Sequence, residues 1–216
     1  MGASASAFPV VAGIDLNHAN LQGTLVKELS LFIDMSLFHL NSNRFTGTVP
    51  DEFRDFDSLK EFDLNNNQFS GSFPSATLYM PSLIYLDLSY NTLMGHVPDT
   101  FFCLQDIQVL NLAHNKLFGE LSDVICSLRS LANLTIAYNF FFGFSQQCSR
   151  LFFKNMGFDV LLNYIPGRDM QRPQPECSMI PGGSLSCLRI STPKSLVCGS
   201  LAVSASKHTN STSSSP

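Results

Sequence analysis

The sequence lacks several features that would assign a function directly. It has no tryptophan, and charged residues make up only 14% of its 216 positions, which is a low share for a soluble protein. No apolar run approaches the roughly 20 residues that a membrane-spanning helix needs, so we expect no membrane span. The motifs G-x-S-x-G and H-E-x-x-H and a glycine-rich phosphate loop are absent, and no histidine lies four residues from a carboxylate. The sequence therefore predicts neither an enzyme nor a cofactor or metal site.

Basic residues are few in the first two thirds of the chain, and acidic residues are few in the last third. The net charge is −4, but residues 1–143 carry 6 Lys+Arg against 14 Asp+Glu, and residues 144–216 carry 7 against 3. The longer part is therefore acidic, which argues against a nucleic-acid partner because phosphate binding needs a basic surface. An acidic surface favours a basic partner, although it can equally serve solubility alone.

What the sequence has in abundance is an internal repeat of 24 residues. Its first apolar position falls at Val11, Met35, Leu59, Leu83, Ile107 and Leu131. A glycine follows twelve residues later each time, at Gly23, Gly47, Gly71, Gly95, Gly119 and Gly143. The unit L-x-x-L-x-L-x-x-N-x-L-x-G is a leucine-rich repeat, and it predicts a solenoid in which each unit packs only on its neighbours.

Within each unit the residue pattern predicts the backbone conformation. The alternation of Phe38 and Leu40 is typical of a strand with one buried face. An asparagine column can bind inward-facing backbone groups where each rung turns: Asn43, Asn67, Asn91, Asn115 and Asn139. The following L-x-G-x-[IVF]-P piece marks plant-type repeats, with short parallel strands and a mostly irregular or 3-10 return side.

The expected fold is thus a right-handed α/β-type leucine-rich repeat superhelix with a C-terminal cysteine-rich cap. We divide it into an N-terminal remnant without a cap (1–10), six repeats (11–143), the cap (144–199) and a disordered Ser/Thr-rich tail (200–216). The first unit has Ala19 in place of the column asparagine, as befits a terminal rung.

The variable strand positions should face outward on the concave side, which solenoids use for partners. Carboxylates with interleaved Tyr and His suit a basic, partly apolar peptide. The alternative is a solvated sheet face without a partner. The candidate contact residues are Asp15, His39, Glu61, Asp63, Tyr85, Asp87, Tyr90 and His114.

Six cysteines indicate an oxidising compartment. Cys103 and Cys126 fall on the return side of consecutive rungs, so they form either a staple between rungs or two buried free thiols. The others, Cys148, Cys177, Cys187 and Cys198, lie in or beside a Pro/Gly-rich stretch that a disulfide-bound cap explains better than a zinc site. If the chain is secreted, Asn133 in Asn133-Leu134-Thr135 is a glycosylation acceptor.

Two stretches resemble the leucine-rich repeat extensins of plants. They are VVAGIDLNHANLQGTL with FHLNSNRFTGTVPDEF near the start, and LNLAHNKL, VICSLRSLANLTIAYNFF and IPGRDMQRPQPECSMIPGG toward the end. The resemblance implies an extracellular, cell-wall-associated protein whose repeats bind basic cysteine-rich secreted peptides of the rapid alkalinisation factor type. It also implies a contribution to cell-wall formation and growth sensing, contact with cell-wall polymers, and a homodimer.

The chain departs from that family in several places. It has fewer repeats, no Ser-Pro extensin tail after Cys198 and no signal peptide before Phe8, so either the chain is cytosolic or its natural start lies further upstream. Tyr164 stands where the family has a cysteine, which predicts one orphaned cap cysteine, with Cys148 as the candidate. Two alternatives to peptide binding therefore remain: a truncated or degenerate member with only a structural role, and an inhibitor of a wall-degrading polygalacturonase.

Overall fold

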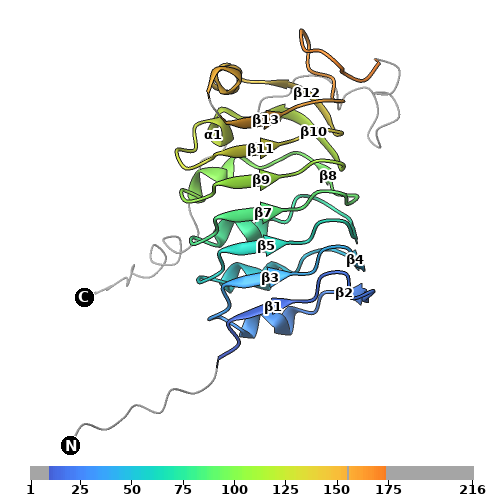
Figure 1. Cartoon of the computed structure of the whole chain (residues 1–216), viewed down its shortest axis with the longest axis vertical. Coiled ribbons are helices and arrows are strands. Elements are labelled where there is room, and N and C mark those ends of the chain that lie inside the picture. The colour runs from blue at the N-terminus through green and yellow to red at the C-terminus, as the bar shows by residue number, and fades with distance from the viewer. Residues whose placement is uncertain (1–9, 155, 174–216) are drawn as a thin grey trace, which may run out of the picture.

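The structure, a computed structural model, describes residues 10–154 and 156–173 and consists of stacked rungs of one repeating unit. Its main element is a seven-stranded parallel sheet in which each strand pairs with the corresponding strand of the next unit. Figure 1 shows these strands stacked along the long axis of the molecule. They are β1 (Gly13–Asp15), β3 (Leu37–His39), β5 (Glu61–Asp63), β7 (Tyr85–Asp87), β9 (Val109–Asn111), β11 (Asn133–Thr135) and β13 (Gly157–Asp159). This arrangement confirms the predicted leucine-rich repeat solenoid.

Strand register follows the 24-residue period of the sequence. Gly13 pairs with Leu37, Leu37 with Glu61 and Glu61 with Tyr85, each 24 residues further along the chain. The central residue of each strand points into the interior, and from β3 to β11 these residues are fully buried: Phe38, Phe62, Leu86, Leu110 and Leu134. The first and third residues of each strand face the other way, and we call that side the open face.

The third leucine position of each L-x-x-L-x-L unit continues the interior. Leu40, Leu64 and Leu88 occupy adjacent parallel rungs of one apolar core, as the repeat predicted. Near the N-terminal end aromatic rings fill this core, with the ring centres of Phe38 and Phe62 5.5 Å apart. Fully burying a side chain of this size contributes about 1.5–3 kcal/mol, so the stack of rungs is stabilised mainly by contacts between neighbouring units.

The asparagine column lies where each rung leaves the strand, and it binds the backbone of its own rung and the one before. Asn67 donates through Nδ2 to the carbonyl oxygens of Leu40, Leu64 and Asn65 at 2.9–3.2 Å. Its Oδ1 accepts the backbone N–H of Phe45 at 3.0 Å. Asn91, Asn115 and Asn139 repeat this pattern one rung at a time. The amide therefore serves the backbone groups that the turn leaves without partners, as an apolar side chain could not.

Two short sheets follow the column on one flank of the stack. The first joins β2 (Gln22–Thr24), β4 (Arg44–Gly47) and β6 (Gln68–Phe69), and the second joins β8 (Met94–Gly95), β10 (Lys116–Leu121) and β12 (Phe140–Phe144). In the first five units the repeat glycine lies at or next to these strands with positive φ, for example +84° at Gly71. An L-residue with a side chain rarely adopts this conformation, which explains the glycine at this position.

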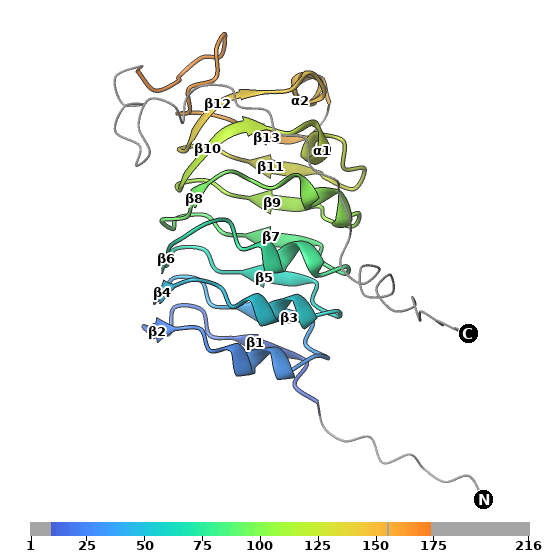
Figure 2. The same cartoon turned by 180° about the vertical axis from the view of Figure 1, so that it is seen from behind.

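Helical segments close the rungs on the side opposite the open face, as the reverse view in Figure 2 shows. Four are 3-10 turns: η1 (Lys27–Leu31), η2 (Asp51–Asp55), η3 (Ser75–Tyr79) and η4 (Asp99–Cys103). Pro50, Pro74 and Pro98 immediately precede η2, η3 and η4 in extended conformation. Where Ser122 replaces the proline, its hydroxyl accepts the N–H of Val124 at 3.3 Å and a short α-helix begins, α1 (Asp123–Cys126). The last two segments are α2 (Gln146–Ser149) and η5 (Arg150–Phe153).

The repeat array extends one rung beyond the six that the sequence predicted. Strand β13 pairs with β11 in the same register, within the segment that we assigned to the cap. Asn163 takes the column position and donates to the carbonyl oxygens of Ile136 and Val160 at 3.0 and 3.1 Å. Gly167, 24 residues after Gly143, has a φ of +72°. The parallel register therefore continues past residue 143, and the sequence signal for this seventh rung was the unbroken phase of Asn163 and Gly167.

Three of the predicted cap cysteines, Cys177, Cys187 and Cys198, and the predicted tail at 200–216 lie outside the described residues. In the part of the chain that the structure does describe, no helix is both long and apolar enough to cross a bilayer.

Candidate functional site

The open face carries a column of polar residues, because parallel register places the third residue of every strand beside its neighbour. Asp15 pairs with His39, His39 with Asp63, and Asp63 with Asp87. Adjacent strands lie about 4.8 Å apart, so the side chains of this column are direct neighbours. We call Asp15, Glu61, Asp63 and Asp87 the acidic patch, since Glu61 begins the strand that Asp63 ends.

Asp63 and Asp87 lie in the column as predicted, but their exposed fractions are only 8% and 5%. The carboxylate of Asp63 accepts the backbone N–H of Asn65 and the side-chain amide of Asn41, both at 2.9 Å. Asp87 accepts the N–H of Ser89 at 2.9 Å and its hydroxyl at 2.6 Å. Neighbouring polar groups thus cover these two carboxylates. A partner on the open face would interact with their charge at a distance and would make little direct contact with them.

The pKa of Asp63 depends on its burial and on the charge of Asp87. Burial raises the pKa of the Asp63 carboxyl above its ordinary value of 3.8, and the charge of Asp87 raises it further, against the opposing hydrogen bonds from Asn65 and Asn41. A cation placed nearby would relieve this repulsion and lower that pKa. The acidic patch therefore favours a positively charged group on the open face.

Tyr85, Glu61 and His39 border the buried pair. The Tyr85 hydroxyl donates to Asp87 Oδ2 at 3.3 Å, and burial together with the charges of Asp87 and Asp63 raises the pKa of the phenol. The side chain of Glu61 is 49% exposed, and its Oε2 lies 3.1 Å from Nε2 of His39, whose side chain is 17% exposed. Asp15 is exposed at the N-terminal edge strand, so Asp15 and Glu61 are the members of the acidic patch that a partner can touch.

A second group of candidate residues forms a stack of rings. Tyr90 and His114 lie face to face with ring centres 4.0 Å apart, and His114 and Tyr138 with centres 3.9 Å apart, each pair inclined by 14°. Each residue follows a strand by three positions and has a positive φ of 52–58°. We call these three residues the aromatic ladder. Tyr138 is not among the eight candidates chosen from the sequence, although its spacing of two repeats from Tyr90 was the signal that could have found it.

The pKa of His114, the middle ring of the ladder, lies below its ordinary value. Burial lowers the pKa of the His114 imidazole below its ordinary value of 6.5. The Arg172 guanidinium lowers it further, while Asp159 acts in the opposite direction. His114 is therefore a neutral aromatic ring at neutral pH, which suits stacking between two tyrosines.

The predicted glycosylation acceptor, Asn133, is the exposed first residue of β11 on the open face. Its side chain lies over Gly157 of the next strand, where an added Cβ would come within 2.8 Å of Asn133 Oδ1. A glycan attached there would cover the sixth and seventh rungs and leave the acidic patch open.

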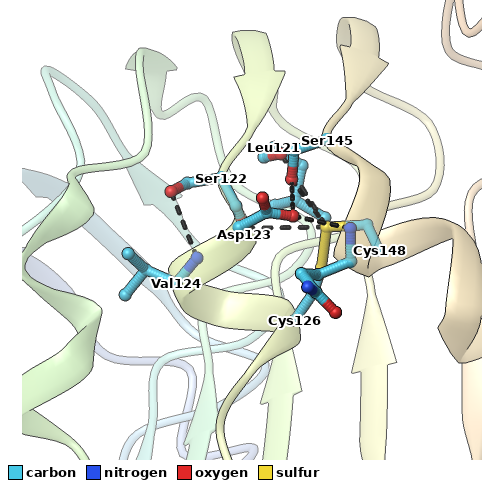
Figure 3. Close-up of a disulfide and its surroundings, with 8 residues drawn as sticks. Leu121, Ser122, Asp123, Val124, Cys126, Ser145 and Cys148 are labelled. Carbon is cyan, nitrogen blue, oxygen red and sulfur yellow. Dashed lines mark hydrogen bonds between the residues drawn. A yellow bond between two sulfur atoms is a disulfide. The ribbon is translucent and has the colours of Figure 1, made fainter.

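Both alternatives for Cys103 and Cys126, a staple between them or two free thiols, are wrong. Cys126 is bonded to Cys148, with Cα atoms 4.9 Å apart, and Cys103 is engaged in a disulfide of its own. Figure 3 shows the Cys126–Cys148 bond linking the short helices of two successive rungs. Cys103 ends a 3-10 turn, whereas Cys126 and Cys148 both lie in short α-helices, so the helix type of the return segment decides which cysteines meet.

The expectation that Cys148 is an orphaned cysteine is likewise wrong. Beside the disulfide, the Asp123 carboxylate accepts the N–H of Gln147 at 2.7 Å and the hydroxyl of Ser145, so α1 holds the start of α2 in place (Figure 3). The disulfide and this carboxylate together fasten the return segment of the fifth rung to that of the sixth.

Comparison with known proteins agrees with this architecture. The leucine-rich repeat family model matches residues 34–93 and 59–117. Leucine-rich repeat extensin-like protein 2 of Arabidopsis thaliana is 68% identical over 34 residues, which are 16% of this chain and 4% of that protein. Leucine-rich repeat extensin-like protein 6 of the same plant is 67% identical over 33 residues, or 15% and 7% of the two chains. The matched segments thus span a small part of these relatives.

Among solved structures, the plant peptide hormone receptor RGFR1 in complex with RGF2 is similar with a TM-score of 0.63 and 27% identity, over 67% of this chain and 23% of that one. The Arabidopsis receptor kinase HAESA in complex with the peptide hormone IDA and the co-receptor SERK1 is similar with a TM-score of 0.60 and 30% identity, over 68% and 24%. Both are plant receptors captured with a peptide.

Proposed function

We propose that this chain, which has the leucine-rich repeat fold and is similar over a short segment to leucine-rich repeat extensin-like proteins, captures basic, cysteine-rich secreted peptides of the rapid alkalinisation factor type. The peptide lies on the open face of the sheet, and the chain acts by binding and carries out no reaction. The proposed setting is the plant cell wall, outside the cell, where binding contributes to wall formation and growth sensing.

The observation that supports this proposal most is the acidic patch. Two carboxylates, Asp63 and Asp87, are paired in register and largely buried, and the charge of Asp87 disfavours ionisation of Asp63. Two more, Asp15 and Glu61, flank them and are exposed. Partly buried like charges project a stronger field than solvated ones, and this field attracts and orients a cationic segment.

The relatives support the same class of partner. RGFR1 and HAESA were each solved with a bound peptide, and both resemble this chain over about two thirds of its length. The extensin-like similarity supports the more specific choice of alkalinisation-type peptides and of the cell wall.

A binding titration with charge-neutralised variants tests the proposal. The ligand is a synthetic, oxidised alkalinisation-type peptide, and affinity is measured by isothermal titration calorimetry at low and high salt. The double variant Asp15→Asn/Glu61→Gln removes the two accessible charges and should weaken binding roughly 3- to 10-fold and flatten the salt dependence. The buried pair stays intact, so the fold is preserved.

The chain offers a matched control on the opposite side. Asp51 and Glu52 are exposed on η2, and Asp51→Asn/Glu52→Gln removes the same two charges from the helical side. This control should bind like the wild type. Absence of saturable binding to the wild type, or an equal loss in both double variants, would refute the proposed function.

A further inference from the structure

The aromatic ladder contains two residues of a type that its backbone does not favour. All members of this column adopt the left-handed conformation, in which glycine, asparagine, aspartate and histidine are tolerated best. His18, Asn66 and His114 follow that preference, whereas Tyr90 and Tyr138 depart from it. The turn itself therefore does not explain the two tyrosines that enclose His114.

The rings are also poorly buried. Tyr90 is 52% exposed and Tyr138 is 37% exposed, although both are large apolar side chains. The ladder therefore presents aromatic surface to solvent along three rungs, next to small residues. Ala113 and Ala137, which immediately precede His114 and Tyr138, are buried and leave the sides of the rings accessible.

Stacking determines which part of each ring a partner can reach. The two faces of His114 are covered by Tyr90 and Tyr138 at 4.0 and 3.9 Å, so its exposed part is the ring edge. The edge of an aromatic ring is its electropositive part, and it prefers to meet the face of another ring. A cation prefers a ring face instead, and both faces of His114 are occupied. The ladder thus suits an aromatic side chain better than a lysine or arginine.

The open face is divided between the two groups. The acidic patch lies on the first four rungs, whereas the fifth and sixth present Val109, Asn111, Asn133 and Thr135, none of which is charged. Glu61, the accessible acid nearest the ladder, lies on the third rung and His114 on the fifth, so the two are about 10 Å apart along the stack at about 4.8 Å per rung. An extended peptide covers this distance with about three residues, at roughly 3.3 Å per residue.

We infer that the aromatic ladder is a second subsite, which takes an aromatic side chain of the same basic peptide edge-to-face while the cationic segment of that peptide lies over the acidic patch. This inference rests on the proposed function and adds a requirement for an aromatic residue a few positions from the basic segment.

The test uses two synthetic probes that differ at one position. Both are short lysine-glycine peptides, one with a single tryptophan near an end and the other with serine in its place. Because the chain contains no tryptophan, emission from the first probe reports on the peptide alone. Calorimetry measures the affinity of both peptides. The tryptophan peptide should bind wild type about 3- to 10-fold more tightly, as expected for an aromatic contact.

The variants separate the effect of the aromatic rings on binding from any effect on folding. Tyr90→Asn/Tyr138→Asn introduces the residue that Asn66 already has in this column, and circular dichroism confirms that the chain folds. This variant should bind the two peptides equally. Tyr90→Phe/Tyr138→Phe keeps the rings, and Ser42→Asn alters the column outside the ladder, so both should retain the preference for tryptophan and the change in its emission.

The outcomes separate this inference from the proposed function. If wild type binds both peptides equally, or if the asparagine variant keeps the preference for tryptophan, the subsite is refuted and cationic binding stands. If neither peptide binds wild type, the cationic binding on which the subsite rests fails as well.

Discussion

Replacing Asn67 by leucine tests whether the asparagine column holds the rungs together. Leucine has a similar branched shape but no polar atoms, so the change removes hydrogen bonds with little change in volume. Four bonds are lost, three from Nδ2 to carbonyl oxygens and one from the Phe45 N–H to Oδ1.

The structure indicates how much each lost bond matters. The three carbonyl groups keep a second donor, because they also accept from Asn43 Nδ2, from Asn91 Nδ2 and from the Ser42 N–H. The Phe45 N–H donates to Asn67 Oδ1 and loses this acceptor in the variant, at a cost of about 1–3 kcal/mol. With the weakened carbonyl interactions added, the free energy of unfolding should fall by about 2–4 kcal/mol.

The assay is thermal and urea unfolding followed by circular dichroism. A loss of that size should lower the melting temperature by roughly 5–15 °C in a domain of this length. Ala19→Leu is the control, because Ala19 occupies the equivalent position of the first rung, is exposed and should change stability by about 0.5 kcal/mol or less. Equal melting temperatures for the two variants would show that the column does not carry this role.

Three further predictions concern the disulfide, the buried carboxylate and the seventh rung. Cys126→Ser/Cys148→Ser opens a link between residues 22 apart and should cost about 3 kcal/mol in unfolding experiments, and a Cys103–Cys126 peptide found by mass spectrometry of the native protein would contradict the pairing. Because the folded-state pKa of Asp63 is raised, its ionised form destabilises the fold at neutral pH, and this destabilisation is relieved as the pH falls through the folded pKa toward 3.8. Wild type should therefore gain stability relative to Asp63→Asn between neutral pH and pH 4, and a constant difference across that range would refute the reasoning. Asn163→Leu should destabilise the chain by about 1–3 kcal/mol in urea unfolding, because it removes the acceptor of a buried N–H, whereas an unchanged midpoint would mean that the seventh rung adds nothing to the stack.

Part of the candidate site followed from the sequence, and part did not. The column Asp15, His39, Asp63 and Asp87 was predicted correctly, since equal spacing along the chain becomes adjacency across a parallel sheet. The burial of Asp63 and Asp87 was not predicted, because it depends on where the amides of neighbouring rungs point. The ladder was visible as three residues 24 apart, but face-to-face contact depends on side-chain rotamers, which spacing does not specify.

The sequence by itself determined the class of fold, the register of the sheet, the buried leucine and asparagine columns and the acidic character of the open face. It could do so because a repeat protein places each residue against its equivalent one period away, so periodicity and contact are the same information. Tertiary structure alone decided the pairing of Cys126 with Cys148, the depth of the two central carboxylates and the stacking of the aromatic ladder. These features depend on helix type and on side-chain direction, which the period of the sequence does not specify.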